Sequence, residues 1–294
     1  MNEQNERPNR PKIEKGQPQT AWLFDIDGVL TDPLEKKVTH PALFDELIKR
    51  LERQEPVALN TGRSLEFVNR VILKPLEKKI ADAHILQNIF GIVEKGGVWI
   101  SYDLDGKQET YVDRNIRAPE DLKDEIRALA AKPPFSETMF YDETKQTMVS
   151  VELLPKDQMH GRSFEEFQEA QRALVVELQR LLSHHHLESS FRIDPSRIAT
   201  DVQNKNVGKA LGVRQFVEAL RTRGVRPTQY LAFGDSESDY EMYEELKRLG
   251  LPGQLVYVGE QEALREKDLS GVVFTRRKVD QGTLEFLQNA TKSV

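Results

Sequence analysis

The stretch Ala21-Trp-Leu-Phe-Asp25-Ile-Asp27-Gly28-Val-Leu-Thr31 decides the fold. Its first four residues are apolar and predict a short buried β-strand, and two acids follow directly, two positions apart. In open α/β sheets, ligand-binding groups gather beyond the carboxyl ends of the strands. Gly28 permits a tight turn, and neighbouring carboxylates repel one another unless they share a cation or a proton. The stretch therefore indicates a cation site, with a solvated Asp-Gly surface turn as the alternative.

Two further apolar runs also end in polar residues. Val57-Ala-Leu-Asn60 is followed by Thr61-Gly62-Arg63, whose hydroxyl and guanidinium suit the phosphate oxygens of a substrate. Tyr230-Leu-Ala-Phe233 is followed by Gly234-Asp235 and, soon after, by Asp239, and carboxylates suit a hard cation such as Mg²⁺. Each signal is weak by itself. Together, the three strand ends predict one site at one edge of a parallel sheet.

The spacing of apolar residues predicts an α/β domain interrupted by an inserted α+β domain. Strands and helices alternate up to about residue 96 and again after Lys209, which is typical of a parallel sheet covered by helices. The segments 97–102 and 110–112 are predicted to form a hairpin, and the order then becomes helix, two strands, helix, two strands. The expected division is a disordered polar tail over 1–19, a core domain over 20–102 and 201–294, and an inserted domain over 103–200.

The composition limits the classes of protein to which this chain can belong. Its 294 residues are 38% hydrophobic, which is enough for one large core or two modest ones. The formal net charge of −6 argues against a broad surface for nucleic acid or for anionic membranes. Cysteine is absent, which excludes disulfides, thiolate nucleophiles and cysteine-bound zinc. No apolar run approaches the ~20 residues of a membrane span and no apolar signal core is present near Met1, so we expect a cytoplasmic protein.

Four motifs, taken together, resemble those of the haloacid dehalogenase superfamily of phosphatases. In chain order they are Asp25-Ile-Asp27-Gly28, Thr61-Gly62-Arg63, Lys209, and Gly234-Asp235 through Asp239. The resemblance covers about residues 20–100 and 200–290 and implies a Rossmann-like, parallel-sheet core. The insertion between the second and third motifs resembles the large α/β cap of the Cof-type, sucrose-phosphatase-like and trehalose-phosphatase-like branches.

The resemblance also implies catalytic roles. Asp25 would be the nucleophile that attacks phosphorus, and Asp27 would protonate the leaving alcohol and later deprotonate the attacking water. Thr61 would hydrogen-bond a phosphoryl oxygen, and Lys209 would neutralise phosphoryl charge and restrain Asp25. Phosphoryl transfer mainly needs alignment and charge stabilisation, so this small set of groups is chemically sufficient.

The metal ligands are implied in the same way. Mg²⁺ would be held by the Asp25 carboxylate, the Asp27 backbone carbonyl and Asp235. Asp239 would either join this set or orient Lys209. Without a cation, these acids would repel a phosphate dianion.

The predicted activity is Mg²⁺-dependent hydrolysis of a phosphomonoester, with a sugar phosphate or a similar small phosphorylated metabolite as substrate. The first alternative is phosphoryl transfer between sugar positions, as in the mutases of the same superfamily. The second is a non-catalytic phosphate- or sugar-binding regulator, which has no need of both Asp25 and Asp27. The oligomeric state is left open.

Three other features have weaker interpretations. Asp103-Leu-Asp105-Gly106 repeats the Asp-x-Asp-Gly string between two hairpin strands, so we interpret it as a simple turn. Glu94-Lys95-Gly96-Gly97 is interpreted as a plain turn, with a cap-hinge or substrate-edge role as the alternative. Five basic residues of the inserted domain are candidates to meet a polar substrate, namely Lys156, His160, Arg162, Arg192 and Arg197.

Overall fold

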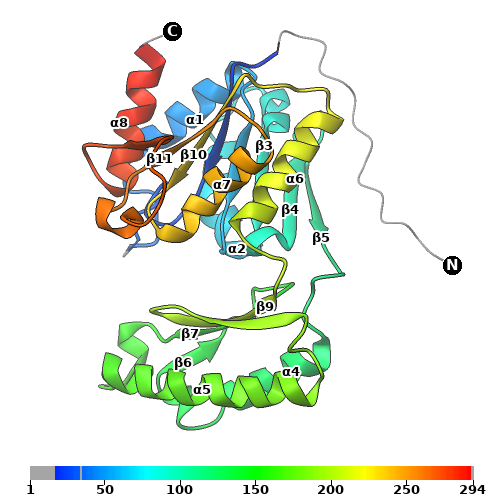
Figure 1. Cartoon of the computed structure of the whole chain (residues 1–294), viewed down its shortest axis with the longest axis vertical. Coiled ribbons are helices and arrows are strands. Elements are labelled where there is room, and N and C mark those ends of the chain that lie inside the picture. The colour runs from blue at the N-terminus through cyan, green and yellow to red at the C-terminus, as the bar shows by residue number, and fades with distance from the viewer. Residues whose placement is uncertain (1–16, 34, 293–294) are drawn as a thin grey trace, which may run out of the picture.

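The computed structural model describes residues 17–33 and 35–292 of the 294-residue chain. Figure 1 shows two bodies, a larger one built on a twisted sheet and a smaller one below it, joined by two crossings of the chain. The larger body is the core and the smaller one is the cap. The predicted fold class, a parallel-sheet α/β core with an inserted α+β cap, is confirmed.

The core sheet has eight strands in the order β12-β11-β10-β1-β2-β3-β4-β5. The first six of these strands are parallel, and β4 and β5 are added as antiparallel strands at one edge. Their bounds are β1 Thr20–Phe24, β2 Val57–Asn60, β3 Ile89–Val93, β4 Val98–Tyr102, β5 Gln108–Val112, β10 Gln229–Gly234, β11 Gly253–Tyr257 and β12 Val272–Phe274.

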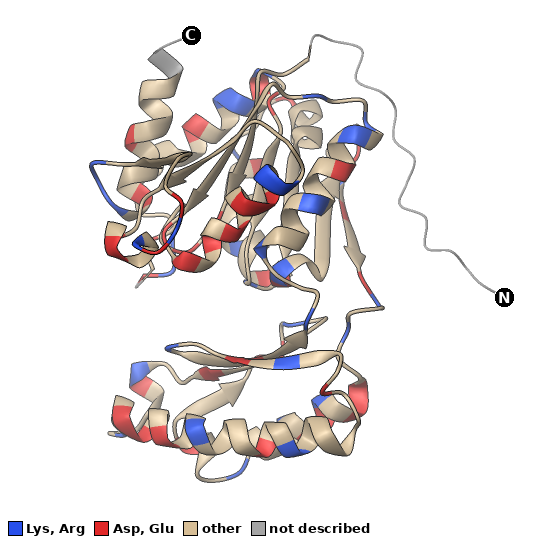
Figure 2. Ribbon diagram, in the orientation of Figure 1, with Lys and Arg blue, Asp and Glu red and all other residues tan. Residues whose placement is uncertain are grey.

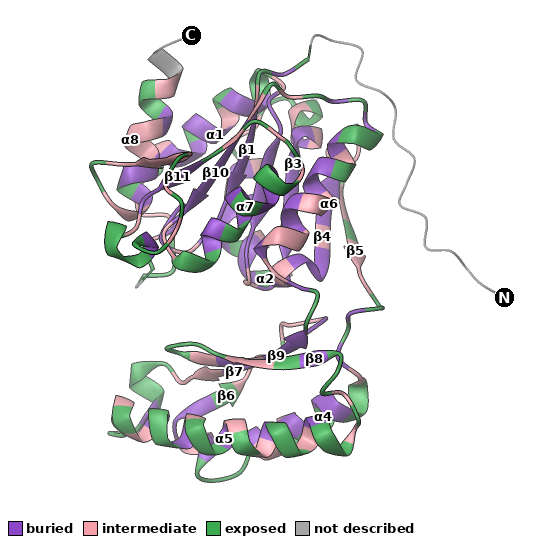
Figure 3. Ribbon diagram, viewed as in Figure 1, coloured by how far each residue is buried: buried purple, intermediate pink, exposed green. Residues whose placement is uncertain are grey.

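Helices cover both faces of this sheet, and the alternation of buried residues along β1 explains why. Trp22 and Phe24 pack on one face, and Ala21 and Leu23 pack on the other. The first face is covered by α1 Ala42–Glu52, by the helical segment α2 Leu65–Val68 with its continuation through α3 Lys74–Glu77, and by α8 Val279–Lys292. The second face is covered by α6 Lys209–Thr222 and α7 Tyr240–Arg248. Figure 3 shows the resulting buried central strands.

The cap is a four-stranded antiparallel sheet with two helices on one face. The strand order is β6-β7-β9-β8. The apolar side chains of alternate strand residues pack against the helices in a separate core, which includes Val149, Val151 and Val202. The bounds are α4 Glu120–Ala130, β6 Met139–Tyr141, β7 Val149–Leu153, α5 Phe164–His184, β8 Phe191–Pro195 and β9 Ala199–Asn204. The other face of the sheet is turned toward the core (Figure 1).

Strand pairing differs from the predicted division of the chain at both ends of the cap. β5 lies within the range expected for the cap. It nevertheless belongs to the core sheet, because it forms a hairpin with β4. β9 continues to Asn204, four residues past the predicted end, because it pairs with β8 along its whole length.

The predicted tail over residues 1–19 falls mostly outside the described residues. Its last residues are attached to the core, since the Gln19 carbonyl accepts hydrogen bonds from the backbone nitrogens of Thr228 and Gln229. None of the described helices combines the length and the apolar character that crossing a membrane requires. The cytoplasmic location stays a prediction.

Candidate active site

The parallel register brings the three polar strand ends to one level at one edge of the core sheet. Phe24, the last residue of β1, pairs with Phe233 of β10 on one side and with Leu59 of β2 on the other. The next residue, Asp25, donates its backbone N–H to the Phe233 carbonyl at 3.0 Å. Asp25 therefore lies between Gly234 and Asn60, where the polar segments of the neighbouring strands begin.

Lys209 completes this arrangement from the first residue of α6. Its Nζ lies 2.5 Å from Oδ1 of Asp25 and 2.9 Å from Oδ1 of Asp239. It also donates a hydrogen bond of 2.7 Å to the Asn60 carbonyl. Three side chains and one backbone carbonyl, from distant parts of the sequence, therefore share one small volume.

Lys209 is held in its charged form. Burial by itself disfavours the ammonium, but the carboxylates of Asp239 and Asp25 outweigh that cost and raise the pKa of Lys209. Only 10% of its side chain is exposed. The site therefore contains a fixed positive charge directly beside the Asp25 carboxylate.

Three carboxylates at this edge fit a divalent cation. Each of Asp25, Asp235 and Asp239 offers one oxygen, and these oxygens lie within 4.8 Å of one another. Burial, with repulsion from Asp239, raises the pKa of Asp25 and raises that of Asp235 to about 7. Buried acids that repel one another favour a bound cation, and oxygen ligands of this kind suit Mg²⁺.

Gly28 is necessary for this cluster. Its φ is +70°, a conformation that favours glycine, and a Cβ at this position would lie 2.0 Å from Oδ2 of Asp235. Only glycine lets the turn after β1 approach the Asp235 carboxylate this closely.

Asp239 is the most constrained of the acids. It is fully buried, and its Oδ2 accepts hydrogen bonds from the backbone N–H groups of Asp235 and Ser236 and from the Ser236 hydroxyl. Its Oδ1 faces Lys209. Of the two expectations for Asp239, these contacts favour the orientation of Lys209 and of the Asp235 loop.

Asp27 and Arg63 are placed together, which the sequence did not predict. The guanidinium of Arg63 donates two hydrogen bonds to the Asp27 carboxylate, 2.7 Å from Nε and 2.8 Å from the terminal nitrogen, and it stacks over the Phe67 ring. About a third of the Asp27 side chain is exposed. Arg63, expected as a substrate contact, instead orients Asp27 toward the open side of the site.

Thr61 and Gly62 connect the end of β2 to Arg63. Thr61 is buried, and its hydroxyl accepts a hydrogen bond of 3.2 Å from the Arg63 N–H. The Gly62 carbonyl accepts a hydrogen bond of 2.7 Å from Lys145 of the cap. The phosphoryl contacts expected of these two residues stay predictions.

Asn60 is a site residue that the sequence analysis missed. Besides its carbonyl contact with Lys209 Nζ, its side-chain amide donates to the Lys209 carbonyl at 2.9 Å. Gly212 of α6 makes this approach possible, since a Cβ there would lie 2.3 Å from the Asn60 amide oxygen. The available signal was a polar residue at the last position of an otherwise apolar strand.

The loop Glu94–Gly96 connects the site to the cap. The buried Glu94 carboxylate accepts hydrogen bonds from the backbone N–H groups of Gln146 and Thr147. Lys95 Nζ lies 3.0 Å from carboxylate oxygens of both Asp194 and Asp201 in the cap. These contacts favour the cap-hinge alternative over a plain turn.

The backbone of Lys95 also joins two segments of the candidate site. Its N–H donates to the Thr61 carbonyl, and its carbonyl accepts from the Gly208 N–H, immediately before Lys209. One residue thus contacts the Thr61 loop, the Lys209 segment and the cap.

Three of the five basic cap residues named as candidates to meet the substrate have other contacts. Arg162 pairs with Glu137 and Glu166. Arg192 donates to the Lys205 and Val207 carbonyls, and Arg197 lies over the Phe164 ring. The acids Asp194 and Asp201, which pair with Lys95, were not predicted.

Comparison with known proteins identifies the family. The sequence model of the haloacid dehalogenase-like hydrolases matches residues 73–249, more than half of the chain. The chain belongs to the haloacid dehalogenase-like hydrolase family. The matched range includes Lys209, Asp235 and Asp239, and the resemblance stated from the four motifs is confirmed at this level. No curated protein matches the chain.

Several solved structures share the fold over nearly the whole chain. The C-terminal domain of C. albicans trehalose-6-phosphate phosphatase is 16% identical, with a TM-score of 0.62, covering 97% of this chain and 99% of that one. A haloacid dehalogenase-like hydrolase from Bacteroides thetaiotaomicron is 13% identical, with a TM-score of 0.62. The match covers 93% of this chain and 100% of that one. The IMP-nucleotidase of Plasmodium falciparum, with IMP bound, is 11% identical, with a TM-score of 0.53 and coverages of 94% and 68%.

Proposed function

We propose that this protein is a Mg²⁺-dependent phosphomonoester hydrolase that acts through an aspartyl-phosphate on Asp25. The observation that carries the proposal is the position of the Asp25 carboxylate, 2.5 Å from Lys209 and within the cluster that includes Asp235 and Asp239. A nucleophilic carboxylate beside a fixed cation and a metal-ligand set is what phosphoryl transfer requires.

The first half of the reaction forms the enzyme ester. An Asp25 oxygen attacks phosphorus in line with the leaving oxygen, and the bond from phosphorus to that oxygen breaks. Asp27, held by Arg63 at the exposed side of the site, donates a proton to the leaving alcohol. Lys209 stabilises the charge that develops on the phosphoryl oxygens.

The second half releases phosphate. The Asp27 carboxylate now accepts a proton from water, and the water oxygen attacks phosphorus, which frees Asp25 and inorganic phosphate. Asp25, Asp235 and the backbone of Asp27 would hold Mg²⁺, with Asp239 behind them. When bound, Mg²⁺ neutralises phosphoryl charge that these acids would otherwise repel.

A sugar phosphate or a similar small phosphorylated metabolite is the proposed substrate. Polar residues of the cap sheet alternate with the apolar residues that pack on α4 and α5; among them Asp201 is partly exposed, whereas Ser150 and Gln203 are buried. Carboxylate and amide groups of this kind can bind hydroxyls. Cap closure would also exclude bulk water. The names of the similar structures support a phosphorylated metabolite without choosing one.

The test compares the matching carboxylates of the two Asp-x-Asp-Gly strings. Asp25→Asn should reduce turnover of a panel of phosphorylated metabolites by about 10³-fold or more, because it removes the nucleophile. Asp103→Asn alters the matching position of the second Asp-x-Asp-Gly string, which lies in the turn between β4 and β5, and should retain full activity. Chelation of Mg²⁺ should abolish activity, and added Mg²⁺ should restore it.

The same panel separates the alternatives. A mutase would return a phosphorylated isomer in place of inorganic phosphate. A binding regulator would bind members of the panel without turnover. Unchanged phosphate release by Asp25→Asn would contradict the nucleophile.

A further inference from the structure

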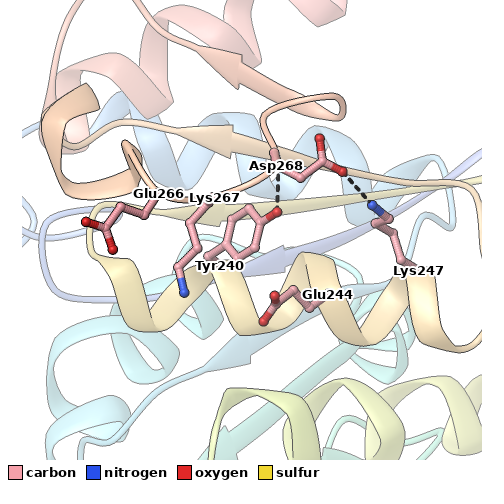
Figure 4. A pocket seen from close by; sticks show the side chains of 6 residues that line it. All are labelled: Tyr240, Glu244, Lys247, Glu266, Lys267 and Asp268. Atoms are coloured by element: carbon pink, nitrogen blue, oxygen red, sulfur yellow. Dashed lines mark hydrogen bonds and ion pairs between the residues drawn. The ribbon is translucent and has the colours of Figure 1, made fainter.

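Two cavities lie outside the candidate active site and differ in their charge balance. The first, of about 430 Å³, lies against α7 (Figure 4). Its lysines are neutralised, since Lys247 pairs with Asp268 at 2.8 Å and Lys267 pairs with Glu237 at 3.1 Å. Its lining has three acids and two lysines, so it has no surplus positive charge with which to attract an anion.

The second cavity, of about 340 Å³, lies where the chain enters the cap. It is enclosed by the segment after β5, by α4 and by the loop between β6 and β7. Its cationic lining residues are Arg114, Arg117, Lys123, Arg127 and Lys145, and its acidic ones are Glu120 and Glu143. None of the candidate catalytic residues lines it.

The acids of this cavity neutralise only part of its positive charge. Arg127 pairs with Glu143 and with Asp124, and Arg117 pairs with Glu120. Among the described residues, no carboxylate lies within ion-pair distance of Arg114 or of Lys145. Five cations facing two acids leave a surplus of three positive charges on the lining.

One of the positive charges of this cavity, that of Lys123, is buried. Lys123 is 4% exposed, it donates to the Gln146 carbonyl at 2.7 Å, and its contact with Glu120 is longer, at 3.4 Å. Burial and the nearby Arg117 lower its pKa. A buried ammonium with incomplete compensation is costly unless a further anion is present.

We propose that this cavity binds a small oxyanion that carries two or more negative charges. Arg114 of the entering segment, Lys123 of α4 and Lys145 of the β6–β7 loop all line it. A multivalent phosphate or carboxylate group matches both the surplus charge and the guanidinium and ammonium donors. This inference does not depend on the proposed phosphatase activity.

The position of the cavity connects it to the hinge. Lys145, on its lining, donates to the Gly62 carbonyl beside Thr61. Gln146, also on its lining, donates its backbone N–H to Glu94 of the core. An anion bound here therefore contacts both the segment that enters the cap and the loop that holds the cap to the core, and it restrains their relative motion.

The test measures binding to metal-free protein by calorimetry, with pyrophosphate and with citrate as separate probes. In the absence of metal, acids outnumber the cations of the active site, so an anion is repelled there. We expect one saturable site for at least one probe, and the probe that binds more tightly identifies a phosphoryl or a carboxylate ligand. Arg114→Ala should weaken binding by about tenfold or more, the effect of losing a charge-assisted hydrogen bond.

Two variants serve as controls. Arg265→Ala removes another exposed arginine, which does not line the cavity, and should leave the affinity unchanged. Arg63→Ala tests whether the probe occupies the active site instead. The proposal is overturned if neither probe saturates, if Arg265→Ala weakens binding as much as Arg114→Ala does, or if only Arg63→Ala weakens it.

Discussion

Nζ of Lys95 lies 3.0 Å from a carboxylate oxygen of Asp201, so an ion pair joins a core loop to a cap strand. The same carboxylate accepts a hydrogen bond of 2.7 Å from Ser150, which fixes its orientation within the cap sheet. Because Lys95 also contacts the Thr61 loop and Gly208 through its backbone, the position of the cap is transmitted to both catalytic segments.

Lys95→Met should weaken cap closure while leaving the core folded. We expect kcat/KM for the preferred phosphate ester to fall by roughly three- to tenfold, since a partly exposed ion pair contributes about 1 kcal/mol. The free energy of unfolding, measured in urea, should change little. Lys74→Met is the matched control, because it removes an ion pair with Glu77 inside the core and should not alter kcat/KM. Equal effects of the two variants would contradict a role for Lys95 in closure.

Comparing Gly28→Ala with Gly224→Ala should distinguish the effect of backbone strain from loss of the metal cluster. A new Cβ at Gly28 would clash with Asp235, so we expect Mg²⁺ binding and activity to be lost. Gly224→Ala has nearly the same φ, +71°, but open space around it. Both variants should lose about 1 kcal/mol of stability from the left-handed backbone, whereas only Gly28→Ala should lose Mg²⁺ affinity in calorimetry.

Asn60→Ala should displace Lys209. The variant leaves the Lys209 carbonyl without its amide donor and should cost about 1–3 kcal/mol of stability, with a drop in kcat. Asn88→Ala, which removes another buried amide that contacts the Leu51 carbonyl, should reduce stability but not kcat. Urea unfolding and steady-state kinetics provide the two readouts, and a normal kcat for Asn60→Ala would exclude a positioning role.

Mg²⁺ affinity should depend on pH. Burial raises the pKa of Asp235 to about 7, and the metal binds the ionised carboxylate, so protons compete with Mg²⁺ below that pH. Burial also raises the pKa of Asp25, the other carboxylate ligand, so we expect affinity to fall by about tenfold or more per unit below about pH 7 and to level off only where both carboxylates are ionised. Calorimetric titrations between about pH 6 and pH 8 would show this, and an affinity that is flat over this range would contradict it.

The sequence was informative where local pattern determines position. Apolar runs of three or four residues predicted β1, β2 and β10. The acids and the hydroxyl that follow them could be placed at one edge because parallel strands end together. The family resemblance connected Lys209 to the same edge. The observed α6 begins at Lys209, so the lysine is held by a helix end.

Contacts through space were harder to predict. Side-chain directions are not encoded in the periodicity of the sequence. They determine the ion pair of Arg63 with Asp27 and the hydrogen bond from Asn60 to the Lys209 carbonyl. The pairing of Lys95 with Asp194 and Asp201 depends on where the whole cap lies. Figure 2 shows charged residues spread over both bodies, so charge alone does not mark these partners.

The short connection that leaves the cap has a mechanical consequence. Only residues 205–208 separate the end of β9 from Lys209, a span of at most about 18 Å when fully extended. A displacement of the cap at this connection would reach the first turn of α6, and with it the Lys209 ammonium, through only these four residues. The length of this tether therefore limits how far the end of β9 can move from the charged centre.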